Sequence, residues 1–287
     1  MSLFYKLGGL TIKTDDFFDD FAKHHLSSYQ IDETPNVDVC YHIHTNCKHI
    51  MPPEGTLIAE VNSRQWFLTP EGGYAFVDYI RTITDDILNL VVCSPDFKHI
   101  EAWFCPSEVM SLSPDRRPYY MIHEVLRYAL LPAGGTIIHA SSLAYNGQGL
   151  LFSAPSGTGK STHTRLWTEF APGTKIVNDD MPIIRIHDSV PYLYGAPWSG
   201  KSSIHENITV PLSAIIFIER ATCCELLPMD KTEAVWQLFE AIRKPVIPTL
   251  AEKNLDVIGR IVETLPIYRL RCDISETAVK TSMQALR

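Results

Sequence analysis

Long apolar runs, an excess of basic residues and a regular cysteine spacing are all missing from this sequence of 287 residues. No apolar run approaches the roughly 20 residues that span a bilayer, which argues against a membrane protein. The formal net charge is −8, so no global positive field would attract nucleic acid or an anionic membrane. The seven cysteines are odd in number and lack framework spacing, which is typical of reduced thiols. With an N-terminal stretch too short and mixed for a signal peptide, we expect a cytoplasmic protein.

The composition allows a sizeable core, because hydrophobic residues make up 45% of the chain and charged residues 20%. This balance is ordinary for globular proteins, and the length suits either one large domain or a small domain joined to a larger one. Low-complexity segments and internal repeats are missing too, apart from one doubled GKS motif.

The first part of the chain consists of short apolar or alternating runs, at residues 4–13, 37–44, 57–61, 65–68, 74–80 and 100–104. Pro, Gly and Asn clusters separate several of them, which predicts an antiparallel sheet. Two prolines and mixed charge make residues 111–118 the best linker candidate. We therefore predict a β-rich N-terminal region over residues 1–118 and a second domain over residues 119–287.

The second domain mixes both kinds of regular structure. Apolar spacing predicts a helix over residues 120–131. The pair Asn146-Gly147 accepts positive φ at both turn positions, so residues 136–145 and 149–153 are expected to form a hairpin. Further runs predict strands at 175–177, 182–187, 190–194, 213–219 and 267–271, and helices at 230–243, at 250–264 and from Ser275 onward. The fold class predicted is mixed α/β.

The segment APSGTGKS at residues 154–161 has the context of a phosphate-binding loop. An apolar strand delivers the chain to it, and residues 161–170 can form the helix whose N-terminus attracts anions. Only the first position departs from the pattern G-x-x-x-x-G-K-S/T, because Ala154 replaces glycine. The alternative is a glycine-rich turn that binds no ligand. As a nucleotide site it would use Ser156, Gly157, Thr158, Gly159, Lys160, Ser161 and Thr162, with Lys160 on the β- and γ-phosphates of ATP and Ser161 on Mg²⁺.

The segment GAPWSGKS at residues 195–202 matches the same pattern without a mismatch, but its context is weaker. A β-branched run and Pro211 follow it, which leaves little room for a helix and its dipole. It is either a coincidental loop or a second loop facing the first, in which Lys201 supplies positive charge to the transferred phosphoryl group or to the substrate.

Two carboxylates, Asp179 and Asp180, end the predicted strand at 175–177. Phosphoryl transfer needs an acidic group that holds Mg²⁺ and often a second one that accepts the proton of the attacking hydroxyl. Successive residues at a strand end point in different directions, so the two could divide these roles, in an order that the sequence leaves open. The alternative is a solvated Asn-Asp-Asp turn. His139, on the hairpin before the first loop, is either a structural histidine or part of the site.

Taken together, these residues resemble the HPr kinase/phosphorylase family and, more distantly, ATP-dependent phosphoenolpyruvate carboxykinases. The resemblance rests on IIHASSLAYNGQGLLFSAPSGTGKST (137–162) and KIVNDDMPII (175–184), supported by PYLYGAPWSGKSSIHEN (191–207) and LPIYRLRCD (265–273). It implies a carboxykinase-like P-loop kinase core, in which Lys160 and Ser161 bind nucleotide phosphate and Mg²⁺. It also implies that Asp179 or Asp180 matches the base and metal carboxylates, with Asp180 and Ser161 taken as the metal ligands, and that His139 matches a histidine before the phosphate loop.

One departure bears on the substrate. The signature by which HPr kinases meet their protein substrate is not recognisable around residues 191–207, and APWSGK looks closer to offshoots that phosphorylate free serine or the serine of a modified peptide. We therefore expect an ATP- and Mg²⁺-dependent kinase that phosphorylates an alcohol of the seryl type on a small molecule or peptide. Its catalytic residues would be Asp179, Asp180, Lys160, His139 and Lys201. The alternatives are a nucleotide-binding regulatory protein and, third, a carboxylyase; homo-oligomer formation stays open.

One segment looks like a metal cluster, with Cys40, His42, His44, Cys47 and His49, but its spacing matches no standard zinc pattern. Strand alternation would place Cys40, His42 and His44 on one face and apolar residues on the other. We expect the apolar face to be buried and the Cys/His face to be in water, without a metal.

Overall fold

The computed structural model describes residues 2–61, 63–79, 86–106 and 116–286, which form two compact units. The first unit comprises residues 1–132 and 245–250, and the second comprises residues 133–244 and 251–287. The division thus follows residue 132, whereas the sequence placed it after residue 118. The cause is helix α2 (Arg117–Leu130), which contacts strands of the first unit. Of the predicted linker, residues 111–115 lie outside the described residues.

The first unit contains a nine-stranded sheet in the order β3-β1-β2-β4-β9-β8-β7-β6-β5. An antiparallel sheet was expected, but β4 pairs in parallel with both β2 and β9. Parallel neighbours need a crossover, and α1 lies in the connection from β2 to β4. The elements are β1 (Ser2–Leu7), β2 (Leu10–Asp15), α1 (Asp20–Leu26), a 3₁₀ turn (Ser27–Tyr29), β3 (Gln30–Ile31), β4 (Val39–His44), β5 (Thr56–Val61), β6 (Arg64–Leu68), β7 (Tyr74–Tyr79), β8 (Ile87–Cys93) and β9 (His99–Phe104).

Several local predictions in this unit can be compared directly with the strands. The run predicted over residues 4–13 is two strands, β1 and β2, because Gly8 and Gly9 form a turn at φ 56° and 77°. On β4, residues 39, 41 and 43 are buried while His42 and His44 are exposed, as alternation predicted. The two histidines face carboxylates: His42 lies 3.4 Å from Asp15, and His44 lies 2.6 Å from Glu101.

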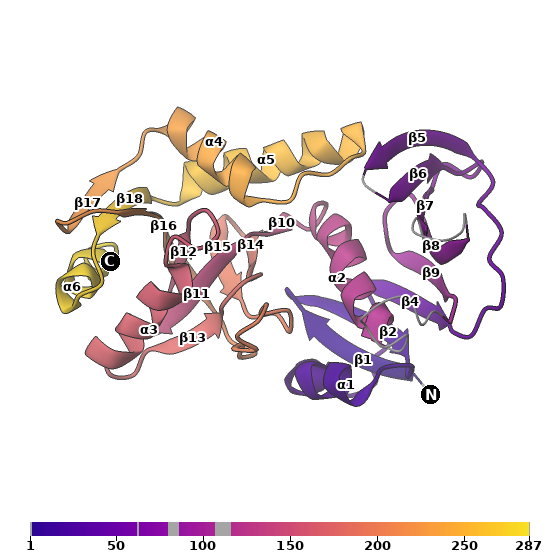
Figure 1. The fold of residues 1–287 in the computed structure, drawn as a ribbon, viewed down its shortest axis with the longest axis horizontal. Coiled ribbons are helices and arrows are strands. Elements are labelled where there is room, and N and C mark those ends of the chain that lie inside the picture. Colours follow the sequence, from indigo (N-terminus) through magenta and orange to yellow (C-terminus); the bar gives the residue numbers. More distant parts are fainter. Residues whose placement is uncertain (1, 62, 80–85, 107–115, 287) are drawn as a thin grey trace. The chain divides into compact units, whose positions relative to one another are not determined.

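The second unit contains the strand order β10-β14-β15-β16-β12-β11-β13, with β18 pairing β16 and β17 pairing β18 (Figure 1). The sheet is mixed, because β16 is parallel to both β12 and β18 while the other pairs are antiparallel. Its strands are β10 (Gly135–Ile137), β11 (Ala140–Tyr145), β12 (Gln148–Ser153), β13 (Lys175–Asn178), β14 (Ile183–His187), β15 (Val190–Tyr194), β16 (Thr209–Arg220), β17 (Glu225–Pro228) and β18 (Ile267–Cys272), and its helices are α3 (Lys160–Phe170), α4 (Lys231–Ala241), most of α5 (Pro248–Thr264) and α6 (Glu276–Met283).

Short-range signals predicted the turns and caps of this unit correctly. Asn146 and Gly147 have φ of 49° and 77° and join β11 to β12. Asp230 caps α4 by accepting from the backbone N–H of Glu233, and Ser275 caps α6. One prediction was wrong, since the expected strand over residues 136–145 is interrupted between β10 and β11. Within the break, the N–H of Ile138 bonds to the carbonyl of Pro182, and that of His139 bonds to Ala241.

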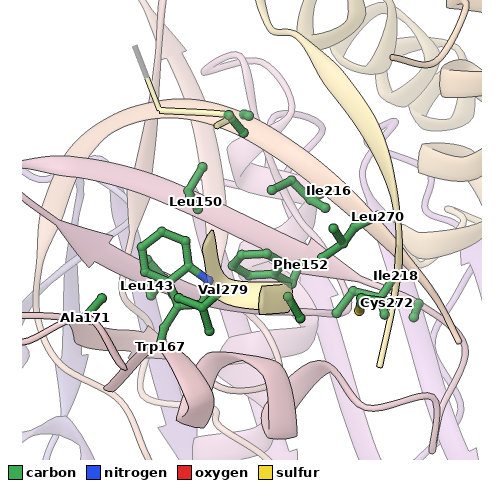
Figure 2. Packing of buried hydrophobic residues seen from close by; sticks show 14 residues of the cluster. Leu143, Leu150, Phe152, Trp167, Ala171, Ile216, Ile218, Leu270, Cys272 and Val279 are labelled. Carbon is green, nitrogen blue, oxygen red and sulfur yellow. The ribbon is translucent and has the colours of Figure 1, made fainter. Parts of the chain in front are cut away.

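A buried cluster holds α3 and α6 against the sheet of the second unit. It includes Phe152 and Trp167, together with side chains from β11, β12, β16 and β18 (Figure 2). Residues 149–153 of β12 are buried throughout, which explains the continuous apolar run there, because both faces of the strand are covered. The N-terminus of α3 is thereby fixed at the end of β12.

Candidate active site

The loop between β12 and α3 has the strand–turn–helix arrangement that the sequence predicted. Gly157 and Gly159 adopt φ of 78° and 125°, a backbone region that side-chain-bearing residues rarely enter. Helix α3 begins directly after Gly159, and no side chain caps its first turn. The first N–H groups of a helix need partners. The start of α3 is therefore open to an anion, which the helix dipole would also favour.

Lys160 lies at the start of α3 and is largely buried. Its ammonium group donates to the carbonyl of Ala154, at 3.0 Å, and contacts Nε2 of His139, also at 3.0 Å. Burial lowers the pKa of Lys160, against the opposing effect of Asp180 and Asp179. Ala154 is itself buried in the core cluster, so a methyl group fits where the pattern has glycine.

Strand β13 ends at Asn178, whose side chain positions the acidic pair and the second GKS loop together. Its amide nitrogen donates to the carbonyls of Ala196 and Trp198, at 2.6 and 3.0 Å. Its amide oxygen accepts from the backbone N–H of Asp180, at 2.8 Å, and of Met181. Apart from the Asn-Asp-Asp turn itself, no feature of the sequence predicted this role of Asn178.

Asp179 and Asp180 point to different partners. Asp179 is 7% exposed and accepts from the hydroxyl of Ser141, at 2.7 Å. Ser141 also contacts the hydroxyl of Thr164 on α3, at 2.8 Å, so Asp179 is tied to the helix that follows the first loop. Asp180 faces His139 instead, with Oδ1 3.0 Å from Nδ1.

His139 lies in the break between β10 and β11, and it bridges the loop lysine and the acidic pair. Its Nε2 faces the ammonium group of Lys160, and its Nδ1 faces Asp180. An ammonium group only donates, so Nε2 accepts and the proton of a neutral ring lies on Nδ1. Nδ1 is 3.0 Å from Oδ1 of Asp180, but the two atoms are not aligned for a hydrogen bond, and Nδ1 has no hydrogen-bond partner among the described residues. Lys160, His139 and Asp180 thus form a polar chain of close contacts, in which the contact between Lys160 and His139 is a hydrogen bond.

The second GKS segment forms a loop without a helix, as predicted: no residue from 195 to 208 is helical. Its two glycines are required by close approaches. A Cβ on Gly195 would lie 1.8 Å from the carbonyl oxygen of Glu206, and one on Gly200 would lie 2.9 Å from Oδ2 of Asp180. The packing of this loop alone therefore accounts for both glycines of the literal match, with Gly200 lying against Asp180.

These elements surround one cavity of about 600 Å³. Every predicted site residue borders it except Thr158, which faces a neighbouring cavity. Four lining residues were not among the predicted site residues: Arg165 on α3, and Ser199, Gly200 and Ser202 of the second loop. The hydroxyl of Ser199 is buried without a hydrogen-bond partner among the described residues. The lining is His139, Ser156, Gly157, Gly159, Lys160, Ser161, Thr162, Arg165, Asp179, Asp180, Ser199, Gly200, Lys201 and Ser202.

A protein-family model described as SynChlorMet cassette protein ScmC matches residues 119–286. The chain belongs to the ScmC family. The ScmC match begins within α2 and includes every residue that lines the cavity.

Comparisons with individual proteins add little to the ScmC assignment. No curated protein matches the chain. Among solved structures, the chain is similar to the HPr(Ser) kinase/phosphatase from Coxiella burnetii, with 12% identity, a TM-score of 0.31, and coverage of 52% of this chain and 91% of that one. None of the helices in the described ranges is long and apolar enough to cross a membrane.

Proposed function

We propose that this ScmC-family protein is an ATP- and Mg²⁺-dependent kinase that phosphorylates an alcohol, of the seryl type, on a small molecule or peptide. The observation that carries the proposal is the polar chain of Lys160, His139 and Asp180 at the uncapped start of α3. A phosphate-binding lysine and a carboxylate able to accept a proton thereby meet in one cavity.

The phosphates of ATP fit the first loop. The N–H groups at the start of α3 lack a capping side chain, and Gly157 and Gly159 let the backbone turn toward a ligand. Lys160 is placed to neutralise the β- and γ-phosphates once it leaves the carbonyl of Ala154. The desolvated ammonium group gains from such a partner, because burial disfavours its charge.

Mg²⁺ fits the oxygen-rich side of the cavity, since it prefers carboxylate and hydroxyl ligands. Ser161 and Asp179 would hold it: both border the cavity, and the contact of Ser141 with Asp179 takes only one carboxylate oxygen. When bound, the ion would neutralise charge on the phosphates during transfer. Asp180, which the sequence also offered as a metal ligand, is given the other role.

Asp180 is the proposed general base. Its side chain is 28% exposed, lies beside His139 and has the loop at Gly200 packed against it. In the step, the acceptor oxygen forms a bond to the γ-phosphorus and the bond to the β,γ-bridging oxygen breaks. ADP leaves with that electron pair, and the acceptor's proton passes to Asp180. His139 lies beside the carboxylate, and Lys160 stabilises the charge on the leaving phosphate.

The acceptor side is assigned to the loop that carries Ser199 and Lys201. The hydroxyl of Ser199 is buried and unpaired among the described residues, although it borders the cavity. Buried polar groups usually have partners, so a ligand that completes its hydrogen bond is favoured. The exposed Lys201 adds positive charge near the transferred group.

A phosphotransfer screen tests this proposal against a nucleotide-binding regulator that performs no chemistry. Wild-type protein and Asp180→Asn would be incubated with γ-labelled ATP and Mg²⁺ across serine-like metabolites and seryl peptides. Asp188→Asn, in an exposed turn, is the matched control. Label transfer by wild type and the control but not by Asp180→Asn supports the kinase. Nucleotide binding without transfer to any acceptor would favour the regulator.

A further inference from the structure

A second cavity, of about 530 Å³, adjoins the phosphate loop within the second unit. Three segments far apart in the sequence meet there: the loop with α3, the end of β16, and the end of β18 with the residues that follow it. The lining is Gly157, Thr158, Gly159, Thr162, His163, Leu166, Ile218, Arg220, Ala221, Cys272, Asp273 and Ile274.

Both cavities share one wall, because Gly157, Gly159 and Thr162 border each of them. Arg220 fixes this wall from the side of the second cavity. Its Nε donates to the carbonyl of Thr158, at 2.9 Å, and its terminal nitrogen donates to the carbonyl of Gly157. A molecule bound across the loop would therefore occupy both cavities.

The direction of a bound triphosphate follows from Lys160. A loop lysine of this kind reaches the β- and γ-phosphates, and Lys160 points into the first cavity toward His139. The γ-end thus lies beside the acidic pair, and the α-end lies on the opposite side of the glycine turn. The rest of the nucleotide would leave the loop past Thr162, where the second cavity opens.

The lining of this cavity suits a flat, mainly apolar ring that carries polar edges. Leu166, Ile218 and Ala221 supply an aliphatic surface, and Arg220 and Asp273 add a guanidinium and a carboxylate to the lining. One oxygen of Asp273 accepts from the hydroxyl of Ser275, at 2.5 Å. A carboxylate has further acceptor sites, so amino or hydroxyl groups of a nucleoside could still be bound there.

We propose that the second cavity binds the base and ribose of the nucleotide, packed on Leu166, Ile218 and Ala221. This inference rests on the proposed function only in placing phosphates at the Lys160 loop. It also supplies the base-contacting residues, for which the sequence offered no candidates.

The test compares two probes by calorimetry on the full chain: a non-hydrolysable ATP analogue and inorganic tripolyphosphate. Wild type should bind the analogue at least about tenfold more tightly, equivalent to about 1.4 kcal/mol. Ala221→Trp fills the cavity, so it should lose that advantage and still bind tripolyphosphate like wild type. Thr222→Trp, one residue further and outside the lining, is the matched control and should resemble wild type. Thermal unfolding shows whether both variants fold.

A second measurement needs no variant. Photolabelling of wild type with an azido-adenine nucleotide should modify peptides containing residues 218–221 or 272–274. Labelling elsewhere, equal affinity of wild type for both probes, or unchanged analogue binding by folded Ala221→Trp would each overturn the inference. Every readout in these tests is binding. A protein that passes them but transfers no phosphate would therefore support the nucleoside site and contradict the proposed kinase activity. A wild type that binds neither probe would contradict both.

Discussion

Replacing Asp180 by asparagine should separate catalysis from nucleotide binding. The change keeps the size of the side chain, which matters because Gly200 leaves no spare room against Oδ2 of Asp180. The backbone N–H of residue 180 would keep its bond to Asn178, so the strand end and the loop at 195–202 should stay in place. What is lost is the proton acceptor beside His139.

The magnitude follows from the role. A general base contributes about 10²–10⁴-fold, which corresponds to about 3–5 kcal/mol of activation free energy. We expect kcat to fall by that factor in Asp180→Asn, while the Kd for the magnesium–nucleotide complex changes by less than about threefold, under 1 kcal/mol. Asp179→Asn differs, because that carboxylate is the proposed metal ligand: it should raise the Mg²⁺ concentration needed for half-maximal transfer.

The assay combines calorimetric titration with single-turnover transfer of labelled phosphate at several Mg²⁺ concentrations. Single turnover matters because product release could otherwise mask a slower chemical step. Full transfer by both asparagine variants would refute the reasoning and would leave the pair as a structural turn. A large loss of nucleotide affinity in Asp180→Asn, with Asp179→Asn unaffected, would exchange the two roles.

Three further predictions follow from contacts around the first loop. Arg220→Ala should weaken binding of the ATP analogue several-fold, because the carbonyls of residues 157 and 158 lose the donor that orients the loop. Arg220→Lys should restore part of the affinity. Equal affinities of wild type and Arg220→Ala in calorimetry would contradict this role of Arg220. Ser282→Ala should lower the free energy of unfolding by about 1–3 kcal/mol in urea titrations, because the indole N–H of Trp167 then loses its buried acceptor, whereas a loss near zero would mean that the site relaxes. Burial lowers the pKa of His163 to about 4, below its value in the unfolded chain. The stability that the neutral ring contributes is therefore fully present above about pH 6.5 and is lost as the pH falls toward 4. This contribution amounts to about 3 kcal/mol, so His163→Gln, but not the exposed His187→Gln, should make the free energy of unfolding depend less on pH between 7 and 4.

Short-range chemistry made much of the second unit predictable. Asn146-Gly147, Asp230 and Ser275 act within a few residues of their own positions, and each does what its type predicts. The first GKS segment was favoured over the better literal match for its flanking strand and helix. The structure has that helix after Lys160 and none from residue 195 to 208.

Long-range contacts set what the sequence could not predict. The break at Ile138 and His139 depends on carbonyls of Pro182 and Ala241, and no pattern near residue 138 indicates it. Asn178 joins the acidic pair to the second loop through carbonyls of residues 196 and 198. The parallel pairing of β4 likewise depends on which distant strands are available.

The second cavity illustrates the same limit. It is built from α3, β16 and the end of β18, whose side chains meet only after the sheet has formed. Nothing in the residues around Ala221 or Asp273 marks them as a binding surface, because the lining combines ordinary aliphatic residues with two common charged ones.

The most direct test of the central claim is calorimetric titration of Lys160→Ala and Lys201→Ala with a non-hydrolysable ATP analogue and Mg²⁺. Lys160 lies at the uncapped start of α3, whereas Lys201 lies in a loop that no helix follows. We predict that Lys160→Ala loses at least about tenfold in affinity, or about 1.4 kcal/mol, and that Lys201→Ala binds the analogue like wild type. Loss of binding in Lys201→Ala with Lys160→Ala unaffected would contradict the account and would make the literal motif at 195–202 the nucleotide site.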